Sequence, residues 1–131
     1  MNPSSNQHPD PRLWQAEHLI HTKQQLAQAA SPLQPAYRKL LFDADKALTA
    51  GPFSVLDKPM TPPSGDKQDY YSVGPYWWPN PDTADGLPYV RRDGAVNPER
   101  DQYDAAARSH MEHAVVTLAL AYFFSGDEQY A

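Results

Sequence analysis

The feature that most constrains the fold is a proline-dense middle segment, residues 51–98, in which no helical or strand period persists. Nine of the 14 prolines fall in it, together with turn pairs such as Asn80-Pro81 and Asp93-Gly94. Because proline lacks a backbone N–H and fixes φ, a regular helix cannot run through such a segment. Any helices must therefore come from the sequence on either side of it.

Apolar residues recur at steps of three and four on both sides of this segment, which is the period of a helix with one buried face. The pattern predicts helices at about 13–30, 33–50 and 101–125, with the loop 51–100 before the last of them. Residues 1–12 are polar with three prolines and are interpreted as a flexible leader. The prediction is an all-α fold with a long irregular loop between the second and third helices.

The third predicted helix is followed by a stop signal. Gly126 stands where a left-handed glycine commonly ends a helix, and Asp127 can cap a further turn, "DEQYA". The chain stops within that turn. We therefore expect residues 13–131 to be the front of a longer all-α domain, truncated at Ala131.

Composition disfavours several classes of function. The 131-residue chain has a net charge of −5, so nucleic acid is not expected as a partner, because phosphate binding requires a basic face. The chain has no cysteine, and hence no disulfide framework or thiolate metal site. No apolar run approaches the roughly 18–20 residues that span a bilayer, and the first residues lack a signal-peptide pattern, so no membrane partner is expected.

The middle segment is rich in aromatic side chains, which disordered linkers typically lack, so we interpret it as an ordered loop. Within it, "YWWPNP" sets Trp77 and Trp78 side by side, and Lys67, Arg91 and Arg92 supply cations nearby. Flat indole faces can stack on sugar rings, and an arginine can bind a carboxylate through two parallel hydrogen bonds. This combination favours a surface for an acidic polysaccharide.

Two other interpretations of the segment stay open. Trp77 and Trp78 can simply pin a long loop onto the helices; successive residues of extended backbone point opposite ways, so one indole can be structural and the other exposed. Alternatively, the proline-rich pieces "TPPSG" and "YWWPNP" form a groove or a ligand for a protein partner.

Other catalytic or metal-binding patterns are weaker. Two pairs of histidines are spaced three residues apart: His18 with His21, and His110 with His113. Neither pair has an evident third ligand, which a metal site would need. A glycosidase needs a pair of carboxylates, and the loop offers three candidates for it: Asp57, Asp66 and Asp69. Turn and capping roles are favoured for them in so turn-rich a loop. We therefore expect no metal site and no cofactor.

Three motifs follow one another in this part of the chain: "PPSGDK", "YWWPNP" and "GLPYVRRDG" followed by "NPE". In this order and at these separations they resemble the opening region of the alginate lyase family of polysaccharide lyases. The likeness continues through "AVVTLALAYFFSGDEQYA" and covers most of residues 19–131. It implies an (α/α) toroid of helical hairpins around a cleft, of which this chain is the N-terminal portion.

The resemblance implies cleavage of a uronic-acid polymer, alginate or a glucuronan, by β-elimination. The family is expected to carry the reaction on an Asn-His pair and on a later arginine and tyrosine, whereas no asparagine of this chain precedes a histidine. The main base and acid are thus expected beyond Ala131. Tyr70 and Tyr71 are the candidates here for contact near the cleaved bond.

The same resemblance implies that residues 64–92 form a wall or lid of the cleft. The expected substrate-binding residues are Lys67, Asp69, Tyr76, Trp77, Trp78, Arg91 and Arg92. Gln68 departs from the histidine expected at its position, so no proton transfer is assigned to it. The family also implies a periplasmic or secreted protein, although no export signal is visible. The alternative function is a non-catalytic carbohydrate-binding module for acidic polysaccharide.

Overall fold

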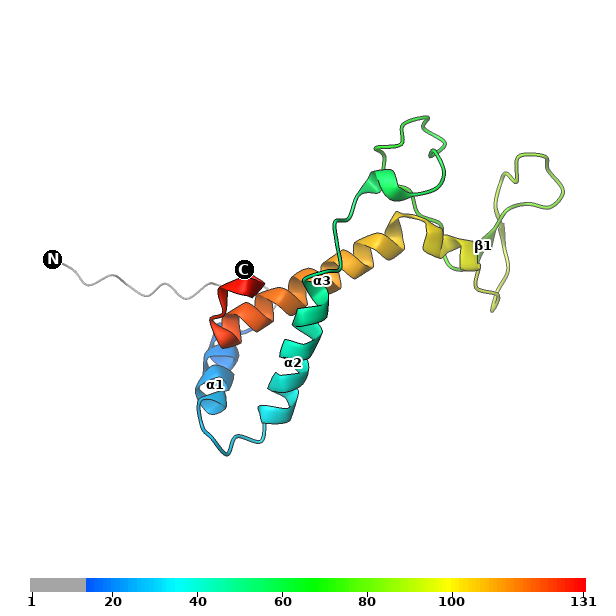
Figure 1. Ribbon diagram of the computed structural model, residues 1–131. Helices are drawn as coiled ribbons and strands as arrows, with labels where there is room; N and C mark the ends of the chain where they lie inside the picture. Colours follow the sequence, from blue (N-terminus) through cyan, green and yellow to red (C-terminus); the bar gives the residue numbers. More distant parts are fainter. Residues whose placement is uncertain (1–13) are drawn as a thin grey trace. The chain divides into compact units, whose positions relative to one another are not determined.

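The computed structural model describes residues 14–131, so the expected leader and the first residue of the first expected helix lie outside the described residues. The described part is rich in helix and poor in strand (Figure 1). Its long helices are α1 (Ala16–Leu26), α2 (Gln34–Ala47) and α3 (Asp104–Ser125). This content agrees with the predicted all-α class.

The chain divides into two compact units. The first comprises the described residues up to Lys46 together with Thr117–Ala131, and the second is Ala47–Val116. Helix α3 contributes its first turns to the second unit and its last turns to the first.

In the first unit, α1 and α2 form a hairpin joined by residues 27–33 (Figure 1). Ala44 of α2 and Ala121 of α3 are fully buried, and Tyr130 is 6% exposed against them. The Tyr130 hydroxyl donates a hydrogen bond to Asp45 Oδ1 at 2.7 Å. The cluster is extended by Leu40, Leu41 and Leu118. Small side chains at the centre let the helices approach closely, and one tyrosine closes the core.

Helix α1 ends at Leu26, earlier than the sequence period indicated. The side-chain amide of Gln34 donates to the Leu26 carbonyl at 3.0 Å, which satisfies one of the free carbonyls at the end of α1. Ser31 is buried in the connection, and its Oγ accepts a hydrogen bond from the N–H of Leu33 at 3.3 Å. The alanine-rich stretch after α1 therefore folds as a turn rather than as a further turn of helix.

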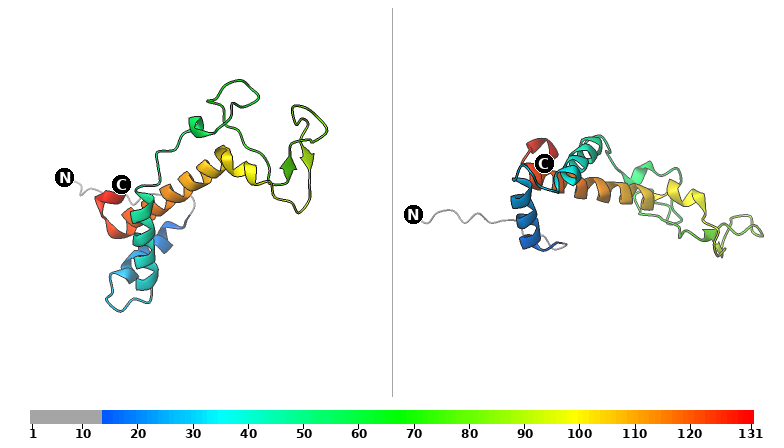
Figure 2. Two further views of the ribbon diagram at one scale, coloured as in Figure 1. Left: turned by 45° about the vertical axis from the view of Figure 1, so that its right-hand side comes forward. Right: turned by 90° about the horizontal axis from the view of Figure 1, so that it is seen from below.

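The second unit is a long irregular segment laid against the first turns of α3. It contains two very short strands, β1 (Trp77–Trp78) and β2 (Val90–Arg91). They pair antiparallel, with Trp77 opposite Arg91 and Trp78 opposite Val90, and enclose the loop between them (Figure 2). We call this pair the ribbon. Strands of two residues leave no period in a sequence, so the ribbon was not predicted.

Asn97 fixes the chain between the ribbon and α3. It is 2% exposed, and its Oδ1 accepts from the N–H of Glu99 at 3.0 Å, which caps the 3-10 helix Pro98–Gln102. Its side-chain amide donates to the Trp77 carbonyl at 3.0 Å, and its N–H donates to the Pro75 carbonyl at 2.7 Å. The helical pattern expected from about residue 101 is thus preceded by a separate 3-10 helix.

The end of α3 has the stop that the sequence predicted. Gly126 has a φ of +71°, and its N–H donates to the Tyr122 carbonyl at 2.8 Å. Asp127 then caps the 3-10 turn Glu128–Tyr130 by accepting from the N–H of Gln129 at 3.1 Å. Over the residues described, no helix has both the length and the apolar character needed to cross a membrane.

Candidate functional site

A buried ion pair fastens the middle loop to the start of α3. The side chains of Lys58 and Asp104 are 1% and 4% exposed, and Lys58 Nζ lies 3.0 Å from Asp104 Oδ2. The same ammonium donates to the carbonyl of Lys67 at 2.8 Å and to the carbonyl of Val55. One buried cation therefore holds both ends of the loop 55–67, and three oxygens compensate its burial.

Asp104 also fixes the backbone of Tyr71. Its Oδ2 accepts a hydrogen bond from the Tyr71 N–H at 2.8 Å, and its own N–H donates to the Tyr71 carbonyl at 3.1 Å. The chain crosses the start of α3 at this point. As a result Tyr70 lies in a pocket on one face of α3, and residues 72–75 line a groove on another.

Tyr71 belongs to a cluster of three tyrosines. Its ring meets the ring of Tyr103 edge-on at 5.3 Å, and its hydroxyl is hydrogen-bonded with Tyr89. Burial, helped by that hydrogen bond, raises the pKa of Tyr71 to about 12, and burial also raises the pKa of Tyr103. At neutral pH Tyr71 is therefore a phenol that can donate a proton, and it is poorly suited to act as a base.

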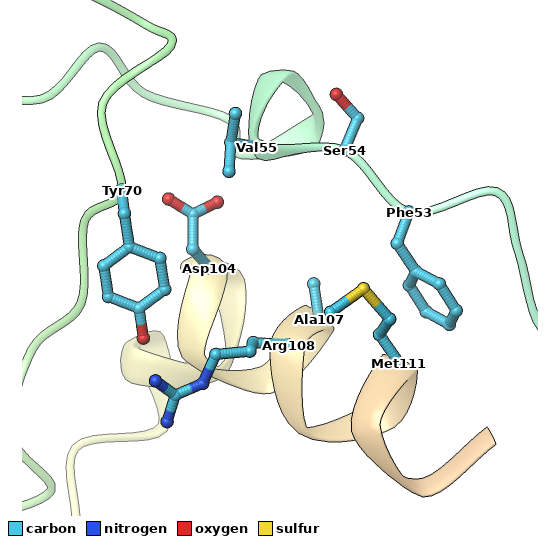
Figure 3. Close-up of a pocket in the computed structure, with 8 residues that line it drawn as sticks. All are labelled: Phe53, Ser54, Val55, Tyr70, Asp104, Ala107, Arg108 and Met111. Carbon is cyan, nitrogen blue, oxygen red and sulfur yellow. The ribbon is translucent and has the colours of Figure 1, made fainter. Parts of the chain in front are cut away.

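Tyr70 is 47% exposed and lines a pocket of about 130 Å³ (Figure 3). The pocket walls are largely apolar, from Phe53, Val55, Ala107 and Met111. The Arg108 guanidinium lies 5.6 Å from the centre of the Tyr70 ring, which is within cation–π range. Figure 3 shows the phenol hydroxyl directed toward this guanidinium. An aromatic face and a cation thus meet at one side of an apolar pocket.

The two tryptophans of the ribbon have different surroundings. The indole N–H of Trp78 donates to the Ala95 carbonyl at 2.9 Å, and the Arg92 guanidinium lies 5.1 Å from its ring centre. Trp77 is 44% exposed and packs on Gly74, where an added Cβ would lie only 2.7 Å from Trp77 Cδ1. Trp78 is held within the ribbon, whereas Trp77 presents much of its surface to solvent.

The three predicted cations, Lys67, Arg91 and Arg92, have different partners. Arg92 stacks on Trp78, and the neighbouring Arg91 forms an exposed ion pair with Asp93 at 2.8 Å. Lys67 is exposed, and its backbone carbonyl accepts a hydrogen bond from Lys58 Nζ at 2.8 Å. The remaining predicted positions are solvent-facing: Asp69 and Tyr76, the latter 39% exposed. The structure therefore joins one predicted cation, Arg92, to one tryptophan, Trp78.

A larger groove, of about 510 Å³, lies against a different face of α3. It runs between residues 72–75 and the helix residues Ala105, Ala106, Ser109 and His110, with Arg100 and Asp101 also lining it. His110 entered the sequence analysis only as a possible metal ligand. Within residues 14–131, no three histidine, cysteine or acidic side chains gather as a metal site would require.

With this geometry in view, comparison with known proteins decides the family. The family model described as "Alginate lyase" matches residues 54–131. This chain belongs to the alginate lyase family. The resemblance seen in the three sequence motifs is confirmed. The matched range contains the ion pair, the tyrosine cluster, the ribbon and the groove of this alginate lyase family chain.

A solved structure gives the same result. The crystal structure of an alginate lyase from Bacteroides ovatus at 1.60 Å resolution matches with a TM-score of 0.80 and 55% sequence identity. The match covers 92% of the present chain and 31% of the chain in the crystal structure. The present chain therefore spans about a third of the length of that relative. A search of the curated proteins found no match.

Several residues of the site were missed from the sequence. Lys58 and Arg108 look like ordinary surface cations there, because nothing local shows that one is buried and the other is stacked. Of the missed residues, Asp104 was the easiest to predict from the sequence, because an acidic residue at a helix start is a typical capping position.

Proposed function

We propose that this chain is the N-terminal part of a polysaccharide lyase that cleaves a uronic-acid polymer, of the alginate or glucuronan type, by β-elimination. The observation that carries the proposal is the family match over residues 54–131, supported by 55% identity with a solved alginate lyase. The chain corresponds to 31% of that structure. We therefore propose that residues 13–131 form the first part of an (α/α) toroid whose other hairpins belong to a longer protein.

β-Elimination sets the chemical requirements. A base removes the C5 proton, the electrons of the C5–H bond form the C4=C5 double bond, and the C4 oxygen leaves with a proton from an acid. The C5 proton becomes acidic enough only when hydrogen bonds or a cation stabilise charge on the adjacent carboxylate. In this proposal the main base and acid lie beyond this chain, because its sequence lacks the expected Asn-His pair.

The tyrosines can assist near the cleaved bond. Tyr70 is exposed beside a guanidinium, so its hydroxyl and ring can contact a sugar. Tyr71, with a pKa of about 12, can donate a hydrogen bond or a proton to the leaving oxygen. We assign both residues a place on the catalytic side of the substrate-binding wall.

The wall itself is proposed to be residues 64–92. The exposed surface of Trp77 can stack on a pyranose ring. Arg92 can take a carboxylate at low entropic cost, because Trp78 already orients its guanidinium. The other predicted binding residues complete the wall: Lys67, Asp69, Tyr76 and Arg91. From the family match, we propose that the protein works in the periplasm or outside the cell.

A direct assay tests the proposal. The chain, and a version extended to the natural stop codon, are incubated with alginate and with glucuronan, and the ultraviolet absorbance of the unsaturated product is followed. We expect activity from the extended version. Absence of product from both versions, with the chain still retarded in gels that contain polyuronate, would instead support the carbohydrate-binding module. Absence of both product and retardation would refute any role with polyuronates.

A further inference from the structure

The groove on α3 is built from one face of the helix and an extended segment facing it. Ala105, Ala106, Ser109 and His110 fall at i, i+1, i+4 and i+5, so they share a side of α3. The two alanines leave space, while the serine and histidine add polar groups. Residues 72–75 form the opposite wall, and the enclosed volume is about 510 Å³.

The extended wall has free backbone polar groups. Among residues 14–131, the N–H and C=O of Ser72 and Val73 have no hydrogen-bond partner. Buried backbone groups of folded proteins are nearly always paired, whereas exposed ones bond to water or to a ligand. The groove therefore offers backbone donors and acceptors in addition to its side chains.

The side chains of the groove add a cation, a carboxylate and an imidazole, from Arg100, Asp101 and His110. Arg100 bonds to Asp101 through Nε at 3.1 Å, which leaves its two terminal nitrogens for another acceptor. His110 and Ser109 are exposed on the helix face. Closely spaced donors and acceptors with one cation match a ligand that carries several hydroxyls and a carboxylate. Uronic sugars have this chemistry.

An extended peptide is the competing occupant, and the geometry disfavours it. A peptide that adds to a strand edge needs several consecutive free backbone groups and pockets for alternate side chains. Here the free edge is short, because Pro75 has no N–H and the carbonyls of Gly74 and Pro75 are already used.

We propose that this groove is a uronate-binding subsite, in which Ser109 and His110 contact sugar hydroxyls and Arg100 binds a carboxylate. The inference rests on the proposed function and extends the binding surface from residues 72–75 of the wall onto Arg100 and the face of α3 that holds Ser109 and His110. Gly74 belongs to both the groove and the wall of residues 64–92, because it lines the groove and the ring of Trp77 packs against it. A sugar chain stacked on Trp77 can therefore continue into the groove.

The chain offers a matched pair of variants for the test. His110→Ala removes a groove residue, whereas His113→Ala removes another exposed histidine of the same helix that does not line the groove. Affinity for a saturated alginate tetrasaccharide is measured by calorimetry, with a neutral glucose tetrasaccharide as the ligand control. We expect His110→Ala to weaken binding of the alginate tetrasaccharide by about 3–10-fold, as the loss of one hydrogen bond predicts. His113→Ala should leave binding unchanged, and the neutral tetrasaccharide should bind much more weakly.

The outcomes separate this inference from the proposed function. If the alginate tetrasaccharide does not bind, if both histidine variants bind it as the parent does, or if the neutral tetrasaccharide binds as well, the uronate subsite is refuted. If a strand-forming peptide displaces the tetrasaccharide, the groove belongs to a peptide. Lyase activity of the extended version, measured separately, would leave the proposed function standing in each of these cases. Conversely, a His110-dependent affinity without any unsaturated product would support the subsite and refute the lyase.

Discussion

Asp104→Asn should destabilise the second unit strongly, because it leaves the Lys58 ammonium buried without its counter-charge. Lys58 is 1% exposed and Asp104 is 4% exposed. Removal of one partner from a buried ion pair costs about 3–5 kcal/mol. The exposed pair of Arg91 and Asp93, with side chains 62% and 79% exposed, gives a control in the same unit, since pairs of that kind contribute about 0–1 kcal/mol.

The size of the expected loss can be compared with the stability of the unit. At about 0.05–0.15 kcal/mol per residue, a unit of roughly 70 residues is stable by about 3–10 kcal/mol. Asp104→Asn should therefore remove much of that stability. The asparagine oxygen can still accept from the Tyr71 N–H, so the change reports mainly on charge.

Urea unfolding and amide hydrogen exchange at Tyr71 measure the effect. The double variant Lys58→Met/Asp104→Asn removes both charges, so it should be more stable than Asp104→Asn alone. The reasoning fails if Asp104→Asn costs less than about 1 kcal/mol, as expected for Asp93→Asn, or if the two substitutions of the double variant simply add.

Two further predictions concern single side chains. Gly74→Ala places a Cβ 2.7 Å from Trp77 Cδ1, so the indole should shift and its fluorescence should change; an unchanged spectrum would contradict the packing. The pKa of Tyr71, raised by burial, and the pKa of Tyr130, raised by the hydrogen bond to Asp45, are both about 12. Because tyrosine in an unfolded chain ionises near pH 10, the stability that these two phenols contribute is complete below about pH 10 and is lost between about pH 10 and 12. An ultraviolet titration should show Tyr71 and Tyr130 among the late phenols, together with Tyr103, whose pKa is also raised by burial, and one late phenol should be lost in each of Tyr71→Phe and Tyr130→Phe; ionisation of all tyrosines near pH 10 would refute this.

The helical part of the fold was largely readable from the sequence. Apolar spacing gave the three helices, and Gly126 and Asp127 marked a stop and a cap that the structure contains. The residues at which the helices end were harder to predict from the sequence. The side chain of Gln34 that closes α1 acts over eight residues, and no local pattern announces it.

The core and the loop depend on contacts that are distant in sequence. The hydrogen bond between the Tyr130 hydroxyl and Asp45 joins residues 85 positions apart in the sequence, and the one between the Tyr71 N–H and Asp104 joins residues 33 positions apart. The burial of Lys58 follows from the whole loop closing around it. The sequence pointed to the aromatic and cationic residue types of the loop, but the stacking of Arg92 on Trp78 required coordinates.

The most direct test of the account is the affinity of the chain for saturated alginate oligosaccharides, compared between the parent and Trp77→Ala. Trp14→Ala is the control, because Trp14 is also exposed, at 42%, and lies in the first unit. We predict a loss of about 1–3 kcal/mol of binding free energy for Trp77→Ala, by analogy with base–aromatic stacking, and no change for Trp14→Ala. Unchanged affinity in Trp77→Ala, together with a lower melting temperature, would show that the indole only supports the loop and would contradict the proposed wall.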